Sequence, residues 1–319
     1  PQNWAGGAVP DLANVATVTL PASASVTFDP SQLSGLAEAG TVNLDAIQGE
    51  LIGASRVSGA LNQVAGTLDV SGDVRLTGYT QAAAGTLSVG GDLAVVTSTG
   101  ISALGQNTVS GTTTVQAPGQ TITLTNTDND FVGLMTLQGG AVSVRDTNTL
   151  STVLASSGDV TITSGDTTSL GTSTVSGNFV LNAGGAVTQT SANDTITVGG
   201  TTSITTTGDD ITLANTGNQF GGQVTASGAD VTLKDASGLN AVVTATGNAS
   251  LTTTAGDLTA SLTVAGNSIL SAGGGLTVSG TTDDLTGTAV GNISLGATTV
   301  GDDLVLSGAG DISQTAALS

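Results

Sequence analysis

The sequence predicts an all-β protein, a right-handed parallel β-helix (β-solenoid) with about 19 residues per turn. Three observations support this prediction. A Gly-Asp or Gly-Asn step recurs at a constant spacing, a short alternation of apolar and polar residues follows each step, and long segments repeat with extra residues inserted between the copies. Alternation with a period of two is typical of strands and not of helices.

The Gly-Asp step sets the length of one turn. It occurs at Gly72, Gly91 and Gly158 and, with Asn in place of Asp, at Gly177. The starts lie 91 − 72 = 19 and 177 − 158 = 19 residues apart. Similar starts at Gly228, Gly247 and Gly266 keep the same spacing of 19. Gly, Asn and Asp favour tight turns, so each step marks a corner that is followed by a strand.

Longer repeats indicate that turns are added as units. Residues 126–146 return at 215–235, and residues 109–124 return at 198–213, both with an offset of 89. A second segment, 170–190, returns at 295–315 with an offset of 125. The difference, 125 − 89 = 36, is close to two turns. A solenoid accepts such insertions because each turn contacts only its neighbours, whereas an antiparallel sandwich does not.

The alternation predicts which residues point inward. The inward apolar residues should stack on their equivalents one turn away. The predicted inward residues include Val160, Ile162, Val231, Leu233, Ile293 and Leu295.

The beginning of the chain differs in composition. Four of the five Pro residues fall in the first 44 residues, and Asp29-Pro30 resembles a helix start, with Asp29 as N-cap and Pro30 in the first helical position. We therefore expect residues 1–44 to form an irregular first turn with partial capping. Residues 45–319 are expected to form the regular shaft that carries the 89-residue repeat.

Composition excludes several functions. The chain has four basic residues, a net charge of −20, no His and no Cys. Binding to nucleic acid or to an anionic membrane surface needs clustered Lys and Arg, so neither is expected. Without His or Cys there is no Ser-His-Asp triad and no thiol chemistry.

With these repeats in view, the sequence resembles the large repetitive bacterial exoproteins related to filamentous haemagglutinin, which leave the cell by two-partner or autotransporter-type routes. The resembling phrases are NDFVG at 129–133, NQFGG at 218–222, LGTSTVSGNF at 170–179 and AGGAVTQT at 183–190. The resemblance implies a β-helical shaft on the outer bacterial surface or in the extracellular medium, with a role in adhesion, biofilm or cell contact. It also implies a surface receptor or a matrix glycan as partner.

Acidic doublets are the candidates for a metal site. Calcium prefers six to eight oxygen ligands, which turns rich in Asp can supply. The candidate ligands are Asp128, Asp130, Asp209, Asp210, Asp283, Asp284, Asp302 and Asp303. The doublets do not persist between copies, since Asp209-Asp210 matches Gln120-Thr121, so we interpret most of them as solvated turn residues. No other cofactor is expected.

Catalytic residues are not predicted. Arg145-Asp146 and Lys234-Asp235 are basic–acidic neighbours, but they occupy equivalent places, 234 − 145 = 89, and we interpret the pair as a surface feature of the repeat. The function predicted is therefore a non-enzymatic structural segment. Three alternatives stay open: a filament subunit that assembles head to tail through the solenoid ends, a polysaccharide-active β-helix enzyme, and an ice-binding solenoid. The last rests on Thr121/Thr123, Thr161/Thr163 and Thr195/Thr197, whose spacings of 40 and 34 do not place them once per turn.

Overall fold

The computed structural model describes residues 17–18, 25–27, 43–47 and 50–319, with side chains described from residue 60 onward. The chain divides into two compact units, residues 1–147 and 148–319, which are described separately. Every described helix-or-strand element is a strand, and the described strand pairs within each unit are parallel. In this part of the chain no helix is long and apolar enough to cross a membrane.

The first unit contains the strands β1 to β14. Their bounds are β1 (Thr17–Val18), β2 (Ser25–Thr27), β3 (Asn43–Ile47), β4 (Glu50–Gln63), β5 (Gly66–Gln81), β6 (Gly85–Val89), β7 (Leu93–Val96), β8 (Ile101–Ala103), β9 (Gln106–Val109), β10 (Thr113–Gln116), β11 (Ile122–Leu124), β12 (Asp130–Phe131), β13 (Met135–Gly139) and β14 (Val142–Asp146).

The second unit contains the strands β15 to β35. Their bounds are β15 (Leu150–Ser156), β16 (Val160–Ser164), β17 (Thr168–Leu170), β18 (Ser173–Val175), β19 (Phe179–Ala183), β20 (Val187–Gln189), β21 (Ile196–Val198), β22 (Thr202–Thr206), β23 (Ile211–Leu213), β24 (Gln219–Phe220), β25 (Val224–Gly228), β26 (Val231–Asp235), β27 (Leu239–Ala245), β28 (Ala249–Thr253), β29 (Leu258–Val264), β30 (Ser268–Ala272), β31 (Leu276–Thr282), β32 (Leu285–Ala289), β33 (Ile293–Val300), β34 (Leu304–Gly308) and β35 (Ile312–Gln314).

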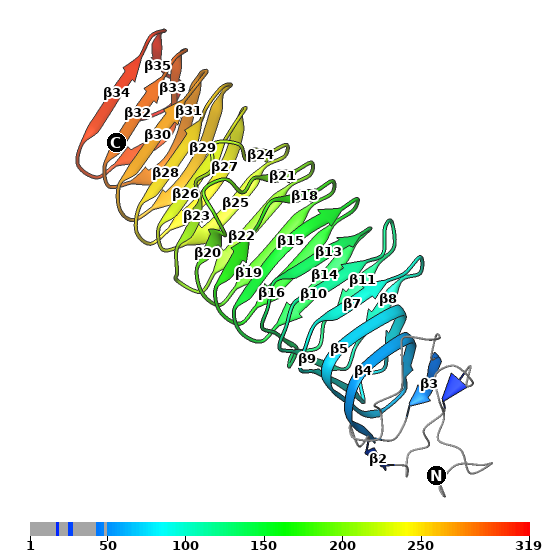
Figure 1. Cartoon of the computed structure of the whole chain (residues 1–319). Coiled ribbons are helices and arrows are strands. Elements are labelled where there is room, and N and C mark those ends of the chain that lie inside the picture. The colour runs from blue at the N-terminus through cyan, green and yellow to red at the C-terminus, as the bar shows by residue number, and fades with distance from the viewer. Residues whose placement is uncertain (1–16, 19–24, 28–42, 48–49) are drawn as a thin grey trace, which may run out of the picture. The chain divides into compact units, whose positions relative to one another are not determined.

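Each unit is a parallel β-solenoid, as predicted, with turns of roughly 19 residues (Figure 1). In the first unit β7, β10 and β13 lie side by side, with Leu93 opposite Thr113 and Thr113 opposite Met135. The same stacking joins β6 to β9 and β8 to β11, so one turn carries three short strands.

The length of a turn varies along the second unit. Val187 pairs with Ile211, which is 24 residues later, in a region where each turn has three strands. Val224 pairs with Ala241, 17 residues later, and from there on each turn has two strands. The 19-residue turn read from the Gly-Asp steps therefore describes the average, because corners differ in length while the strand register is kept.

The core of each unit is formed by inward residues that stack in columns. In the first unit Leu76, Val95, Val115 and Leu137 follow one another, and each is at most 3% exposed. In the second unit all six residues predicted to point inward are buried, namely Val160, Ile162, Val231, Leu233, Ile293 and Leu295. Burying a side chain of this size stabilises the fold by about 1.5–3 kcal/mol. In a solenoid this contribution recurs at each inward strand position of every turn.

The start of the chain also contains parallel strands. Thr17 of β1 pairs with Asn43 of β3, and Ser25 of β2 pairs with Glu50 of β4. Strand β3 spans the predicted boundary at residues 44 and 45. The predicted helix start at Asp29-Pro30 lies outside the described residues.

Candidate functional site

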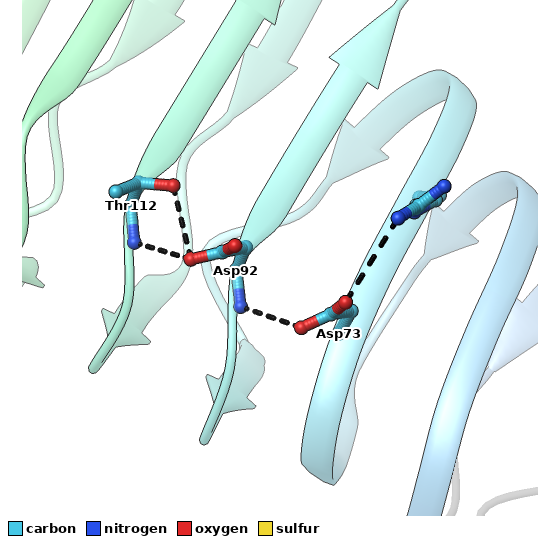
Figure 2. A network of polar contacts seen from close by, with 4 residues as sticks. Asp73, Asp92 and Thr112 are labelled. Carbon is cyan, nitrogen blue, oxygen red and sulfur yellow. Dashed lines mark hydrogen bonds and ion pairs between the residues drawn. The ribbon is translucent and has the colours of Figure 1, made fainter.

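The Asp residues of the Gly-Asp steps bind the backbone of the next turn. In the first unit the Oδ1 atom of Asp73 accepts the backbone N–H of Asp92 at 3.1 Å, and the Oδ1 atom of Asp92 accepts the N–H and the hydroxyl of Thr112 at 2.7 and 2.9 Å (Figure 2). The hydrogen bond from the backbone N–H of Thr112 has the largest effect on the pKa of Asp92, followed by the one from its hydroxyl. Both hold this pKa below its ordinary value. We call this arrangement a corner cap.

Corner caps recur in the second unit. Asp159 accepts the N–H of Asn178 at 2.8 Å, and the amide oxygen of Asn178 accepts the N–H of Thr201 at 2.9 Å. On another corner Asp230 accepts the N–H of Asn248 at 2.6 Å. In every case the acceptor lies one turn before its donor. Corner caps therefore use the Asp and Asn side chains to satisfy backbone donors that the strand ladder leaves unpaired at the corners.

The Gly of the step makes room for the cap. A β-carbon at Gly247 would collide with the carboxylate of Asp230, while the nearest other atom, the carbonyl oxygen of Ala229, would be 3.4 Å away. A β-carbon at Gly177 would likewise collide with the carboxylate of Asp159. The Gly-Asp pair is thus a steric match between successive turns: the Asp side chain of one turn fills the space that the Gly of the next turn leaves open.

Two of the predicted calcium doublets lie side by side. The backbone N–H of Asp302 donates to the carbonyl oxygen of Asp283 at 3.0 Å, and the N–H of Asp303 donates to the Oδ1 atom of Asp284 at 2.9 Å. These four residues therefore occupy one corner on consecutive turns, and Asp284 serves as a corner cap.

The remaining candidates are spread out. Asp210 caps the N–H of Asp230 at 3.0 Å, with Asp209 exposed beside it. Asp128 is exposed and Asp130 is half-buried in β12 of the first unit. Across residues 60–319 no three His, Cys, Asp or Glu residues converge in a way that could hold a metal ion.

The Asp residues of the two basic–acidic pairs are buried, so our interpretation of these pairs as a surface feature is wrong for Asp146 and Asp235. Their exposed fractions are 1% and 0%. The Oδ2 atom of Asp146 accepts the N–H of Phe131 at 2.8 Å, and that of Asp235 accepts the N–H of Phe220 at 2.6 Å. Arg145 is exposed.

An Asn residue completes each of these sites. Asn129 and Asn218 are fully buried, and each precedes the Phe by two residues. The Oδ1 atom of Asn129 accepts the N–H of Asn107 at 2.8 Å, and that of Asn218 accepts the N–H of Ile196 at 2.9 Å. We call each group of Asn, Phe and Asp an Asn-Phe-Asp clamp. The two clamps lie 89 residues apart, so they occupy equivalent positions of the 89-residue sequence repeat.

Sequence reasoning missed a buried ladder of amide side chains in the first unit. Gln81 donates to Gln63 at 3.0 Å, and Asn107 donates to Gln81 at 3.1 Å and to Asn129 at 3.2 Å. The hydroxyl of Tyr79 donates to Asn107, and burial raises the pKa of this hydroxyl. The alternation along the strands could have revealed this ladder. Gln63 follows the inward Leu61 by two residues, and Asn107 precedes the inward Val109 by two, so both amides fall on the inward face.

No curated protein and no solved structure matches the chain. One family model matches residues 71–138, 157–227 and 282–319, which is more than half of the chain. The matched ranges include four of the acceptor residues of the corner caps, Asp73, Asp92, Asp159 and Asn178. The chain belongs to the family described as repeats of unknown function, DUF5649.

Proposed function

We propose that this chain is a non-enzymatic structural segment of a cell-surface or secreted exoprotein, which acts as an adhesin shaft or as an element of biofilm or cell contact. The observation that carries the proposal is the turn-to-turn construction of each unit. Parallel strands, apolar columns and corner caps all join one turn to the next, so many of the Asp and Asn side chains are engaged in holding turns together.

The distribution of the Asp residues supports this proposal. A catalytic or binding centre gathers polar groups from several elements at one place. Here Asp73, Asp92, Asp159 and Asp230 sit at separate corners and bind backbone N–H groups instead. Such a construction gives mechanical cohesion and a long surface for display.

The sequence resemblance to exoproteins of the filamentous-haemagglutinin type supports the finer part of the proposal. It favours the outer bacterial surface or the extracellular medium as the location, and a surface receptor or a matrix glycan as the partner. The net charge of −20 disfavours nucleic acid and anionic membranes as partners.

Location is tested with antibodies raised against this chain. The producing cells are labelled intact and after permeabilisation, and the culture medium is probed in parallel. We expect labelling of intact cells or recovery from the medium. Labelling that requires permeabilisation would contradict the proposal.

The role as a shaft is tested by removing one whole turn. Leu258 pairs with Leu276, so deletion of residues 258–275 joins Asp257 to Leu276 in the register of the lost turn. We expect this variant to keep its β-sheet circular dichroism and the parent protein to keep adhesion. Deletion of residues 258–266 removes part of a turn and is expected to unfold the neighbouring strands. Loss of adhesion on whole-turn deletion, with the fold intact, would indicate a localised binding site and contradict a shaft.

The enzyme alternative is tested with the purified chain. Incubation with a panel of neutral and acidic polysaccharides, followed by measurement of new reducing ends or unsaturated products, is expected to give no turnover above the buffer control. Turnover that disappears when one exposed Asp is replaced by Asn would show that the chain is a polysaccharide-active enzyme instead.

A further inference from the structure

The second unit carries a column of polar side chains on one outer face, and all but one of them bear a hydroxyl group. The outward positions pair from turn to turn through β16, β19, β22, β25, β27, β29, β31 and β33, which lie side by side (Figure 1). The members of this hydroxyl column, in order, are Thr163, Asn182, Thr205, Ser227, Thr244, Thr263, Thr281 and Thr299. All are exposed except Thr163 and Ser227, which are half-buried.

The column was not visible as a Thr-x-Thr motif. Of the three predicted Thr pairs, only Thr161/Thr163 belongs to this face. Thr123 lies on β11 of the first unit and pairs with Ser143, and Thr197 lies on β21 and pairs with Gln219. The spacing between successive members of the hydroxyl column varies with the length of the turn, from 17 residues between Ser227 and Thr244 to 23 between Asn182 and Thr205. A search for a constant spacing misses it for this reason.

The backbone holds this column at regular intervals. Neighbouring parallel strands lie about 4.7–4.9 Å apart, and side chains on one face of a strand lie roughly 6.6 Å apart along it. A second outward column lies two residues earlier on each strand and contains Thr161, Val180, Ser203, Thr225, Val242, Ser261 and Ser279. The two columns form a regular array, mostly of Thr and Ser side chains, over a buried core.

The array carries no charge. None of the fifteen residues in the two columns is ionisable, in a protein whose net charge is −20. Exposed acidic residues of this unit lie at corners, as Asp159 and Asp230 do. A charged partner would be attracted to or repelled by those corners, so the array suits a neutral partner.

We propose that this face binds ice. Small molecules and single sugar units are bound in concave sites with a few converging polar groups, whereas these columns run along successive strands of a sheet. A periodic, neutral array of hydroxyl groups on a fixed backbone matches a partner that is itself neutral and periodic. Ice meets both conditions, since it presents ordered water oxygens. Many weak hydrogen bonds then add with little backbone ordering cost, because the strand ladders have already fixed the positions of the Cα atoms.

The test uses the whole chain and ice as the probe. Thermal hysteresis and inhibition of ice recrystallisation are measured for the unmodified protein, for the Thr263→Lys/Thr281→Lys variant, and for Ser271→Lys/Thr288→Lys. The first pair of substitutions places two long cations on neighbouring turns of the array. The second places the same charges on neighbouring turns of β30 and β32, on another face. Circular dichroism and thermal melting confirm that both variants fold.

We expect the unmodified protein and the Ser271→Lys/Thr288→Lys variant to inhibit recrystallisation, and the Thr263→Lys/Thr281→Lys variant to lose this inhibition. No inhibition by the unmodified chain, or equal loss in both variants, would overturn the proposal. Retention of the unmodified chain on insoluble chitin or cellulose without any effect on ice would assign the face to a neutral polysaccharide and overturn it as well.

Discussion

The Oδ2 atom of Asp235 lies 2.6 Å from the backbone nitrogen of Phe220, and its Oδ1 atom lies 2.7 Å from the backbone nitrogen of Ser237. The side chain is fully buried, and its oxygens accept hydrogen bonds from two backbone N–H groups and from the hydroxyl of Ser237. This Asn-Phe-Asp clamp fastens the short strand β24 to the end of β26, where the strand ladder alone gives few hydrogen bonds.

Replacement of Asp235 by Ala is expected to destabilise the second unit by about 3 kcal/mol, because it leaves the buried N–H of Phe220 and the partly buried N–H of Ser237 without their acceptor. Urea denaturation followed by circular dichroism measures the change. Asp302→Ala, at an exposed residue, is the control and should shift the midpoint little. A loss of similar size in both variants would show that charge and not the clamp is responsible.

Two buried hydroxyl groups weaken the core at equivalent positions of the repeat. The Oγ1 atoms of Thr113 and Thr202 are buried and have no hydrogen-bond partner. Thr→Val at either position removes an unsatisfied polar atom and keeps the shape, so we expect a gain of about 1 kcal/mol in stability. Thr168→Val is the matched control, because the hydroxyl of Thr168 is bonded to that of Ser164 at 2.6 Å and its loss should destabilise. Thermal denaturation of the three variants decides the point.

The steric match in the Gly-Asp step predicts a coupling between Gly247 and Asp230. Gly247→Ala alone should destabilise by about 2 kcal/mol, because the new methyl group collides with the Asp230 carboxylate. In an Asp230→Ala background the same change should cost little, giving a coupling energy on the order of 1–2 kcal/mol in a double-mutant cycle.

Gly100→Ala is the control for this cycle, since the nearest atom to its β-carbon would be 3.5 Å away. Additive effects of the Gly247 and Asp230 substitutions would refute the proposed fit.

The corner cap at Asp92 predicts a dependence on pH. Its pKa is lowered in the folded state from the ordinary value of 3.8. A lowered pKa means that the carboxylate stabilises the fold above the unfolded value, and that this contribution is lost as the pH falls through the lower, folded value. Asp92→Asn keeps an acceptor oxygen and removes the titration, so its melting temperature should fall less between about pH 4 and 2 than that of the unmodified chain.

The control for this measurement is Asp69→Asn, which removes the same charge from the same unit. A melting curve that changes with pH equally in all three proteins would indicate that Asp92 is not the titrating group.

The sequence was sufficient to predict the solenoid and its inward residues, because both follow from local rules. Alternation places Val160 and Ile162 inside, and the Gly-Asp step marks the corners. The same alternation continues through Val142, Val144 and Asp146, yet the charge of Asp146 led to the opposite expectation. Its burial depends on the N–H of Phe131, which lies 15 residues earlier and is brought close only by the coil.

The candidate site was harder to predict from the sequence than the fold, because its residue pattern is typical of more than one kind of site. Asp residues in turns are typical both of metal sites and of corner caps, and sequence alone did not separate the two. The distinction requires knowing which backbone N–H group lies opposite each carboxylate one turn later, as Asp303 lies opposite Asp284. The hydroxyl column was missed for a similar reason, since its members are aligned by register and not by a constant interval along the chain.

The corner caps have a direction, because the side chain of Asp73 receives a donor from Asp92, and that of Asp92 receives one from Thr112. Synthesis on the ribosome delivers the amino end first, so every acceptor exists before the group it will bind. A coil that has formed therefore presents its acceptor oxygens to the segment that follows it in the chain. The order in which the caps can close is thus the order in which the residues are synthesised.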